Sequence, residues 1–354
     1  MTKNKLASPL PRPTLLPGLA RLWRNRHTLQ LGLDPARAVL LEVADPGTAR
    51  LLDLLDGAHS ERMILDHAAR LSVSRDDART LIETLRDAGL VVGAHTLLPH
   101  DLPEPARQRL SAEAAAIALR GPDAPGTPAQ ALRRRAAAQV LVTGRGRLAA
   151  PVAIALAQAG VGHVSADIAG QVEPPDAIGS GLLASDIRRP RTAAVVDAIA
   201  RVAPGTETGP VRRGRASLVV QVGTDRPAGL LAAGYAQRRQ AHLLLGIRDG
   251  VPVIGPLVQA GGSPCLNCLD LHRRDRDPDW PELAAQLAVA GTTEPCAAST
   301  LIAAVGYTVG EILTFLDGGL PETVGGAVEI STPGRVRRRA WPPHPACRCI
   351  GRRR

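Results

Sequence analysis

The chain has 354 residues, a net charge of +10 and 45% hydrophobic residues, which is enough for two domains with separate cores. Prolines at positions 9, 11, 13 and 17 interrupt the N-terminus before an apolar signal segment could form. Apolar runs such as residues 148–160 are shorter than the roughly 18 uncharged residues of a membrane span. The composition argues against secretion and membrane insertion, so we expect a cytoplasmic protein with no membrane partner.

The positive charge is concentrated at the C-terminus. Residues 335–354 carry eight arginines and no acidic residue, whereas residues 1–95 carry 13 basic and 11 acidic side chains. A basic segment can bind phosphates or acidic peptides, or it can be a solvated surface. Because the remaining chain is nearly neutral, we expect no nucleic-acid partner.

The first domain is predicted over residues 21–95, after a disordered segment at 1–20. Two β-type runs, TLQLGLD (28–34) and AVLLEV (38–43), are separated by a turn at Asp34-Pro35. Three helical patterns follow at 47–55, 60–70 and 74–88, and residues 90–92 return as a strand. This order predicts a small winged-helix domain.

The third helix decides between two functions for this domain. It holds Arg75, Arg79 and Arg86 against four acidic residues, so the phosphates of DNA would not attract it. The alternative is peptide capture, in which a strand edge accepts an added strand and a helix supplies apolar contacts. The residues expected to make these contacts are Val39, Leu40, Leu41, Ala78, Leu81, Ile82 and Leu85. With this pattern, residues 27–93 resemble the PqqD-like leader-binding domain of peptide-modifying systems.

A linker rich in proline, alanine and arginine is predicted over residues 96–136, with one helix at about 105–120. The sequence GPDAPGTP (121–128) then breaks the chain. The second domain is therefore expected to cover residues 137–354.

The second domain opens with the pattern of a nucleotide-binding βαβ unit. A buried strand from Gln139 leads into GRGRLA (144–149), an apolar helix to Gly160 and a second strand that reaches Asp167. Glycines in such a turn let the backbone approach a phosphate at a helix N-terminus, and Asp167 has a spacing suited to a ribose hydroxyl. The same pattern also fits a doubly wound sheet that binds no nucleotide. Further strands at 217–223, 241–247 and 251–258 alternate with helices, so an α/β fold with a Rossmann-type sheet is predicted.

Four cysteines come in two closely spaced pairs. Cys265 and Cys268 are separated from Cys347 and Cys349 by 78 residues. Two such pairs are typical of a structural, tetrahedral Zn²⁺ site with a full ligand set, which holds the fold and does not activate water. Unrelated thiols or a redox role are the alternatives, and His272 and His344 flank the pairs as substitute ligands. The fifth cysteine, Cys296, is either a buried structural residue or a thiol nucleophile at a helix N-terminus.

The order of motifs from GRGRLA through SDIRRPR (185–191) and GTD (223–225) to the cysteine pairs resembles the ThiF, MoeB and HesA superfamily over about residues 137–349. Enzymes of this superfamily bind ATP and Mg²⁺ and adenylate a C-terminal carboxylate. The resemblance implies Gly144, Gly146 and Ala149 at the phosphates and Asp167 at the ribose. It also implies Asp225 at Mg²⁺, and it puts Arg191 at the position of a phosphate-contacting lysine.

This sequence departs from the enzymes of the superfamily at two places. The only lysines are Lys3 and Lys5, and the planar guanidinium of Arg191 does not replace a compact ammonium. The segment VEPPDAIGSGLLAS (172–185) lacks the asparagine and arginine that brace the triphosphate in the superfamily. Because charge clamps supply most of the catalysis in this chemistry, the departures argue against adenylation.

The fusion of a PqqD-like domain to a ThiF-like domain, with CLNCLDLHRRDRDPDW (265–280), resembles the actinobacterial leader-peptide-binding proteins of thiazole/oxazole-modified microcins. The resemblance implies an adaptor that binds the leader of a ribosomal precursor peptide and presents the peptide to a separate YcaO-type cyclodehydratase, which uses the ATP. The alternative is a ThiF-like adenylyltransferase. Relatives of this fold commonly dimerise, which implies a homodimer.

Overall fold

The computed structural model describes residues 10–35, 37–43, 46–120, 125–211, 216–223, 228–259, 263–289 and 294–349. The chain divides into two compact units, residues 1–133 and 134–354. Most of the segment predicted as a linker therefore belongs to the first unit. Asp225, the predicted Mg²⁺ residue, lies outside the described residues.

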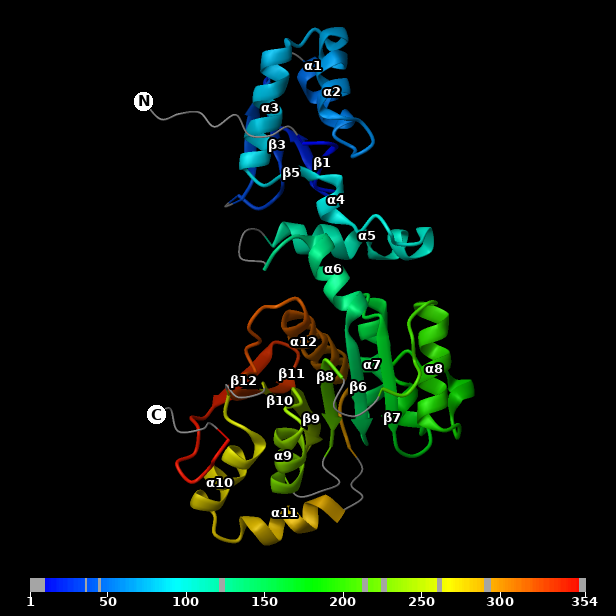
Figure 1. Cartoon of the computed structure of the whole chain (residues 1–354), viewed down its shortest axis with the longest axis vertical. Helices are drawn as coiled ribbons and strands as arrows, with labels where there is room; N and C mark the ends of the chain where they lie inside the picture. The colour runs from blue at the N-terminus through cyan, green and yellow to red at the C-terminus, as the bar shows by residue number, and fades with distance from the viewer. Residues whose placement is uncertain are drawn as a thin grey trace. The chain divides into compact units, whose positions relative to one another are not determined.

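Unit 1 contains two small antiparallel sheets and a set of helices (Figure 1). Strands β2, β3 and β4 form one sheet in that order, and β1 pairs with β5 in the other. The strands are β1 (Pro13–Leu15), β2 (Arg21–Trp23), β3 (Thr28–Leu31), β4 (Val39–Glu42) and β5 (Val91–Gly93). The helices are α1 (Pro46–Leu51), η1 (Leu52–Leu54), α2 (Glu61–Ala68), η2 (Ala69–Leu71), α3 (Arg75–Asp87), α4 (Ala94–Leu97) and α5 (Glu104–Leu119), and α6 (Pro128–Ala137) contains the unit boundary.

The helices of unit 1 begin and end where their sequences indicate. The hydroxyl of Ser60 accepts a hydrogen bond from the Met63 N–H at the start of α2, and Ser74 does the same for the Asp77 N–H at the start of α3. Gly89 follows α3 with a positive φ of 71°, a conformation that glycine adopts at low cost. Helix α3 packs its apolar face into a core shared with β3 and β4.

The predicted disorder of residues 1–20 is wrong at β1. Residues Pro13–Leu15 are buried and pair with Val91–Gly93, and the Leu15 N–H donates to the Leu55 carbonyl. The partner strand lies far along the chain, so no local pattern could indicate this pairing.

Unit 2 is built on a seven-stranded mixed sheet with the order β12-β11-β10-β9-β8-β6-β7. The pairs β6–β7, β6–β8 and β8–β9 are parallel, and the remaining pairs are antiparallel. The strands are β6 (Gln139–Gly144), β7 (His163–Ile168), β8 (Leu218–Val222), β9 (His242–Arg248), β10 (Val251–Val258), β11 (Gly326–Thr332) and β12 (Arg335–Ala340). The helices are α7 (Ala149–Gln158), η3 (Pro174–Ala177), η4 (Ala184–Asp186), α8 (Arg191–Val202), α9 (Ala228–Gln237), α10 (Leu266–Arg276), α11 (Trp280–Val289) and α12 (Ala298–Leu316).

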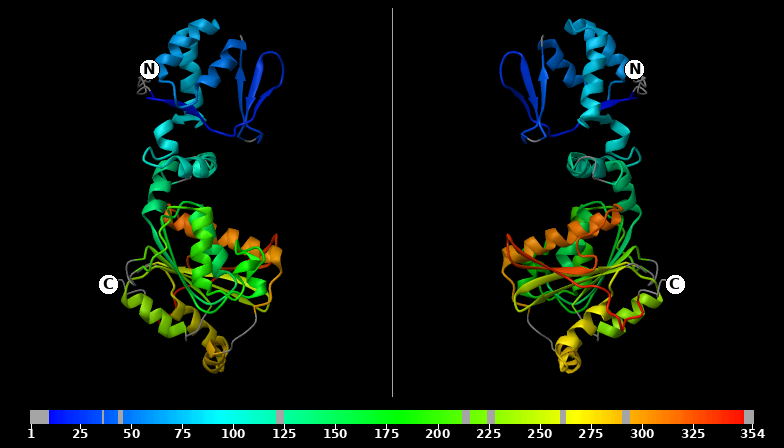
Figure 2. Two further views of the ribbon diagram at one scale, coloured as in Figure 1. Left: turned by 90° about the vertical axis from the view of Figure 1, so that its right-hand side faces the viewer. Right: turned by 90° about the vertical axis from the view of Figure 1, so that its left-hand side faces the viewer.

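Helices cover both faces of this sheet. The main core packs α7, α8 and α12 on one face, and a smaller cluster packs α9 and α10 on the other. Figure 2 shows α12 (orange) and α10 (yellow) on opposite sides of the sheet. Helix α12 is long and apolar enough to cross a membrane by length and composition, but Leu301, Ala304 and Ile312 pack in the core of unit 2. The predicted α/β fold is thus observed, and its sheet contains antiparallel strand pairs in addition to parallel ones.

Candidate functional site

The carboxyl ends of β6, β7 and β8 lie side by side. Thr143 is opposite Asp167 in β7 and opposite Gln221 in β8. Asp167 is exposed at this edge, and the Thr143 hydroxyl donates to its carboxylate across 3.4 Å. In open α/β sheets, ligands bind at the carboxyl ends of the strands, so the predicted nucleotide residues lie at the edge where such a site forms.

The glycine turn, defined here as residues 144–149, connects β6 to α7. Gly144 and Gly146 have φ values of 109° and 141°, which disfavour other residues. A Cβ on Gly144 would lie 2.1 Å from the Val222 carbonyl oxygen. The turn is therefore held tightly against β8, and fully buried Ala149 starts the helix behind it.

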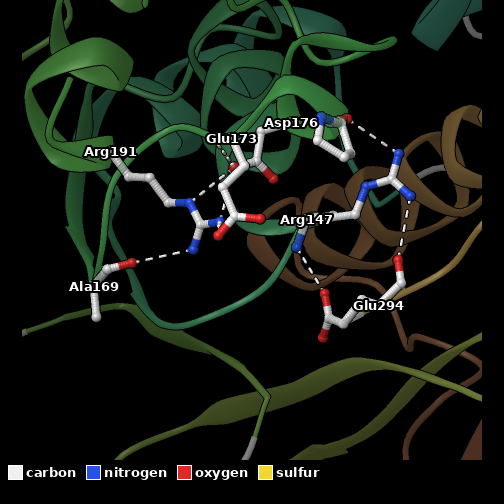
Figure 3. A network of polar contacts seen from close by, with 7 residues as sticks. Arg147, Ala169, Glu173, Asp176, Arg191 and Glu294 are labelled. Atoms are coloured by element: carbon white, nitrogen blue, oxygen red, sulfur yellow. Dashed lines mark hydrogen bonds and ion pairs between the residues drawn. The ribbon is translucent and has the colours of Figure 1, made fainter. Parts of the chain in front are cut away.

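An internal carboxylate lies on this turn (Figure 3). The Arg147 N–H donates to Glu294 Oε2 over 2.8 Å. Burial raises the pKa of Glu294; the hydrogen bond from Arg147 and the charges of Arg191 and Arg147 oppose the rise, and Asp176 adds to it. The sequence analysis missed this contact, because no local pattern marks Glu294 as a neighbour of a turn some 150 residues earlier.

Arg191 is the first residue of α8 and is buried at the same end of the sheet. Its Nε and Nη2 atoms donate to the Asp176 carboxylate over 3.0 and 2.8 Å, and its Nη1 donates to the Ala169 carbonyl over 3.2 Å. Glu173 lies 3.9 Å away. The residue at the position of the family lysine is therefore paired with an internal carboxylate that the sequence analysis did not identify.

Cys296 is half-buried just before α12, and the Arg147 guanidinium donates to its carbonyl over 3.0 Å. Burial raises the pKa of its thiol despite the charge of Arg147. A nucleophilic cysteine needs the opposite shift, so the direction of this pKa shift does not favour a thiol nucleophile.

The four predicted cysteines come together in unit 2. Their sulfur atoms all lie within 4.8 Å of one another, with Cys265–Cys268, Cys265–Cys347 and Cys268–Cys349 separations of 3.9, 3.6 and 3.3 Å. Sulfurs at about 2.3 Å from a central Zn²⁺ would lie roughly 3.8 Å apart, so the spacing fits a metal ion.

The chemistry of this cysteine cluster also fits a cation. Burial raises the pKa of Cys265 to about 11 and also raises the pKa of Cys349, whereas at Cys347 burial is outweighed by hydrogen bonds, first that from Asn267, which lower the pKa to about 7. All four groups are therefore thiolates together only where a cation offsets their charge. The neighbouring histidines have other partners: His344 Nε2 contacts Asp275 over 2.7 Å, and His272 Nε2 contacts the Pro342 carbonyl over 2.9 Å. The cluster thus offers four sulfur ligands and no fifth position from these histidines.

The predicted peptide-contacting residues divide into two groups. Ala78, Ile82 and Leu85 are almost completely buried in the core of unit 1, as is Leu41. They cannot form surface pockets, because the same apolar face of α3 that suggested peptide contacts is needed to hold the small domain together. Leu81 and Val39 are partly buried, and Leu40 is 50% exposed.

Solved structures that are similar to this chain include those of MccB and PaaA. Escherichia coli MccB with ATP matches with a TM-score of 0.67 and 14% identity, over 96% of this chain and 99% of MccB. The microcin C7 biosynthetic enzyme MccB in complex with N-formylated MccA matches with a TM-score of 0.66 and 13% identity over the same shares. PaaA matches with a TM-score of 0.65 and 14% identity, over 91% of this chain and 98% of PaaA. No protein-family model and no curated protein sequence matches the chain. The predicted resemblance is thus confirmed at the level of the fold: the chain shares the fold of MccB over 96% of its length and that of PaaA over 91%.

Proposed function

We propose that this protein binds the leader of a ribosomal precursor peptide through unit 1 and presents the peptide to a separate YcaO-type cyclodehydratase. The observation that carries the proposal is the outer edge of β4, which pairs only with β3 among the described residues. MccB, which shares the fold, has been crystallised with the peptide MccA. The proposal places the protein in the cytoplasm, where its precursor peptide is made.

The backbone of β4 is arranged to accept another strand. The Val43 N–H donates to the His27 carbonyl of the β3 side over 2.7 Å. Because N–H groups alternate in direction along an antiparallel strand, Leu40 and Glu42 direct theirs toward the open edge. Leu40 lies in one cross-strand row with Gln30 and Leu22, and both leucines are more than 40% exposed. The edge therefore offers backbone hydrogen bonds and an apolar surface to an extended peptide.

The end of the unit 2 sheet at which a nucleotide was expected, formed by the carboxyl ends of β6, β7 and β8, supports an adaptor role. Arg191 is committed to Asp176 by two hydrogen bonds, and the only lysines of the chain are Lys3 and Lys5. A triphosphate would have to compete with a buried carboxylate for this cation, without a replacement ammonium. We therefore assign the ATP-consuming step to the partner enzyme and a structural role to a Zn²⁺ ion at the cysteine cluster.

The second candidate is an adenylyltransferase, because MccB of the same fold has been crystallised with ATP. Two assays with the purified chain and its precursor peptide separate the candidates. The adaptor predicts that a YcaO-type cyclodehydratase removes water from the precursor only when this protein is added, as seen by mass spectrometry. It also predicts no peptide-dependent ATP–pyrophosphate exchange by this protein alone, and robust exchange would establish the enzyme instead.

A further inference from the structure

We propose that Glu294 is an internal anion that closes the glycine turn, so that a phosphate group can bind there only after this carboxylate has left. The proposal concerns the nucleotide end of unit 2 and goes beyond leader binding, since it gives that end a built-in competitor for phosphate. It is carried by the contacts of Glu294, Arg147 and Gly146.

The carboxylate of Glu294 fills the space above Gly146. A Cβ on this glycine would lie 2.9 and 3.0 Å from the two Glu294 carboxylate oxygens. One of these oxygens also accepts the Arg147 N–H over 2.8 Å. Glycine-rich turns use such space and such N–H groups at a helix N-terminus to hold the oxygens of a phosphate. The internal carboxylate and a phosphate therefore compete for the same donor and the same volume.

The backbone around Glu294 is fixed by the side chain of Arg147. Its Nη1 atom donates to the carbonyls of Glu294 and Cys296 over 3.3 and 3.0 Å, and its Nη2 atom donates to the Pro175 carbonyl over 3.1 Å. Figure 3 shows the main chain of Arg147 on the carboxylate while its guanidinium reaches the backbone carbonyls. Arg147 of the glycine turn thus donates to the Glu294 carboxylate through its backbone and fixes the backbone of Glu294 through its side chain.

Arg191, whose charge also acts on Glu294, does not leave a place for phosphate either. Arg191 holds Asp176, with Glu173 at 3.9 Å. The Arg147 N–H and the Arg191 guanidinium thus each donate to a carboxylate of the same chain, and the Arg147 guanidinium donates to backbone carbonyls. A phosphate dianion that entered without displacing Glu294 would meet like charge at van der Waals distance, which is unfavourable in a partly buried site.

The test compares binding of inorganic pyrophosphate and of ATP with Mg²⁺ to the full-length protein by isothermal titration calorimetry. Glu294→Ala frees both the space and the donor, and we expect at least about tenfold tighter binding than wild type, since a tenfold change corresponds to an internal contact of about 1.4 kcal/mol. Glu294→Gln keeps an acceptor for Arg147 but removes the charge, and we expect a smaller gain. It serves as the readout if the alanine variant does not fold.

Glu207→Gln is the matched control, because this carboxylate is exposed and lies beside His163 at the start of β7, the opposite end of that strand from the glycine turn. We expect its affinities to equal those of wild type. Tighter binding of both pyrophosphate and ATP by the Glu294 variants indicates a phosphate site. Tighter binding of ATP alone indicates a nucleotide site, and either result supports the proposal. Unchanged affinity in both Glu294 variants, or an equal gain in Glu207→Gln, would overturn it. Leader binding by the same variants is measured separately, so failure of this proposal leaves the adaptor function standing.

Discussion

Cys347, together with Cys349, links the C-terminal segment to the cysteine cluster. Its sulfur lies 3.6 Å from that of Cys265, and it accepts a hydrogen bond from the Asn267 amide over 3.2 Å. A second-coordination amide of this kind orients a metal-binding thiolate. Replacing the sulfur therefore removes one ligand and one contact between segments that are 80 residues apart.

We predict that Cys347→Ser lowers the bound zinc well below one ion per chain and lowers the melting temperature by several degrees, because structural zinc contributes folding free energy. Elemental analysis and thermal unfolding measure the two effects. Cys296→Ser is the control, since Cys296 lies outside the cluster and should leave the zinc content unchanged. Equal zinc content in both variants would refute the metal assignment.

At the scale of residues, the sequence indicated groups whose partners share a chemical rule. The sequence predicted that the four cysteines form one site, because zinc sites use closely spaced cysteine pairs. Asp176 and Glu294 could not be foreseen, because a carboxylate that replaces a phosphate has no spacing rule. The apolar face of α3 was recognised, but periodicity alone does not tell whether Ala78 and Ile82 face a core or a ligand; in a small domain the core takes them.

Helices α6 and α12 are joined by a buried ion pair. The fully buried Arg135 donates from Nε and Nη2 to the Asp317 carboxylate over 2.8 and 2.6 Å, and from Nη1 to the Ala159 carbonyl over 3.2 Å. The contact ties the start of unit 2 to the ends of α12 and α7. Burying both charges costs solvation free energy. The ion pair therefore fixes the arrangement of the helices more than it raises the free energy of unfolding.

We predict that Asp317→Leu destabilises the protein by about 3–5 kcal/mol, because it leaves the Arg135 charge buried without its partner. The double variant Arg135→Met/Asp317→Leu should lose much less than the sum of the single changes. Chemical unfolding followed by tryptophan fluorescence gives the values. Additive losses would show that the two side chains do not act as a pair.

At the scale of elements, local patterns predicted most helices and strands, and the failures have physical causes. Helices α2 and α3 carry serine caps and regular apolar spacing, so their positions followed from the sequence. Strand β1 has three residues and depends on a distant partner. Helix α6 follows directly on the proline- and glycine-rich break at 121–128, which hid it. The first four arginines of the basic C-terminal segment lie on the exposed strand β12, where such charges discourage edge-to-edge pairing.

Unit 1 has a strand edge that is open among the described residues. In unit 2, carboxylates of the chain itself occupy the end of the sheet at which a nucleotide was expected. Unit 1 has its own apolar core, and a second small cluster joins α5 and α6 through Leu110, Ala114 and Leu132. In the segment expected to be a linker, α5 corresponds to the predicted helix, and α6 is a second helix that composition alone did not reveal. The central claim of the proposed function is that unit 1 recognises the leader peptide and that unit 2 is a metal-bound scaffold.

The most direct test of that claim is fluorescence anisotropy of a labelled leader peptide from a candidate precursor, titrated with the full-length protein. We predict saturable binding at micromolar protein. Leu40→Pro removes one of the two N–H groups that β4 directs to its open edge, a change that an edge strand tolerates. It should weaken binding at least about tenfold relative to Leu40→Ala, which keeps the N–H. Absence of leader binding, or equal affinities of the proline and alanine variants, would contradict leader capture at β4.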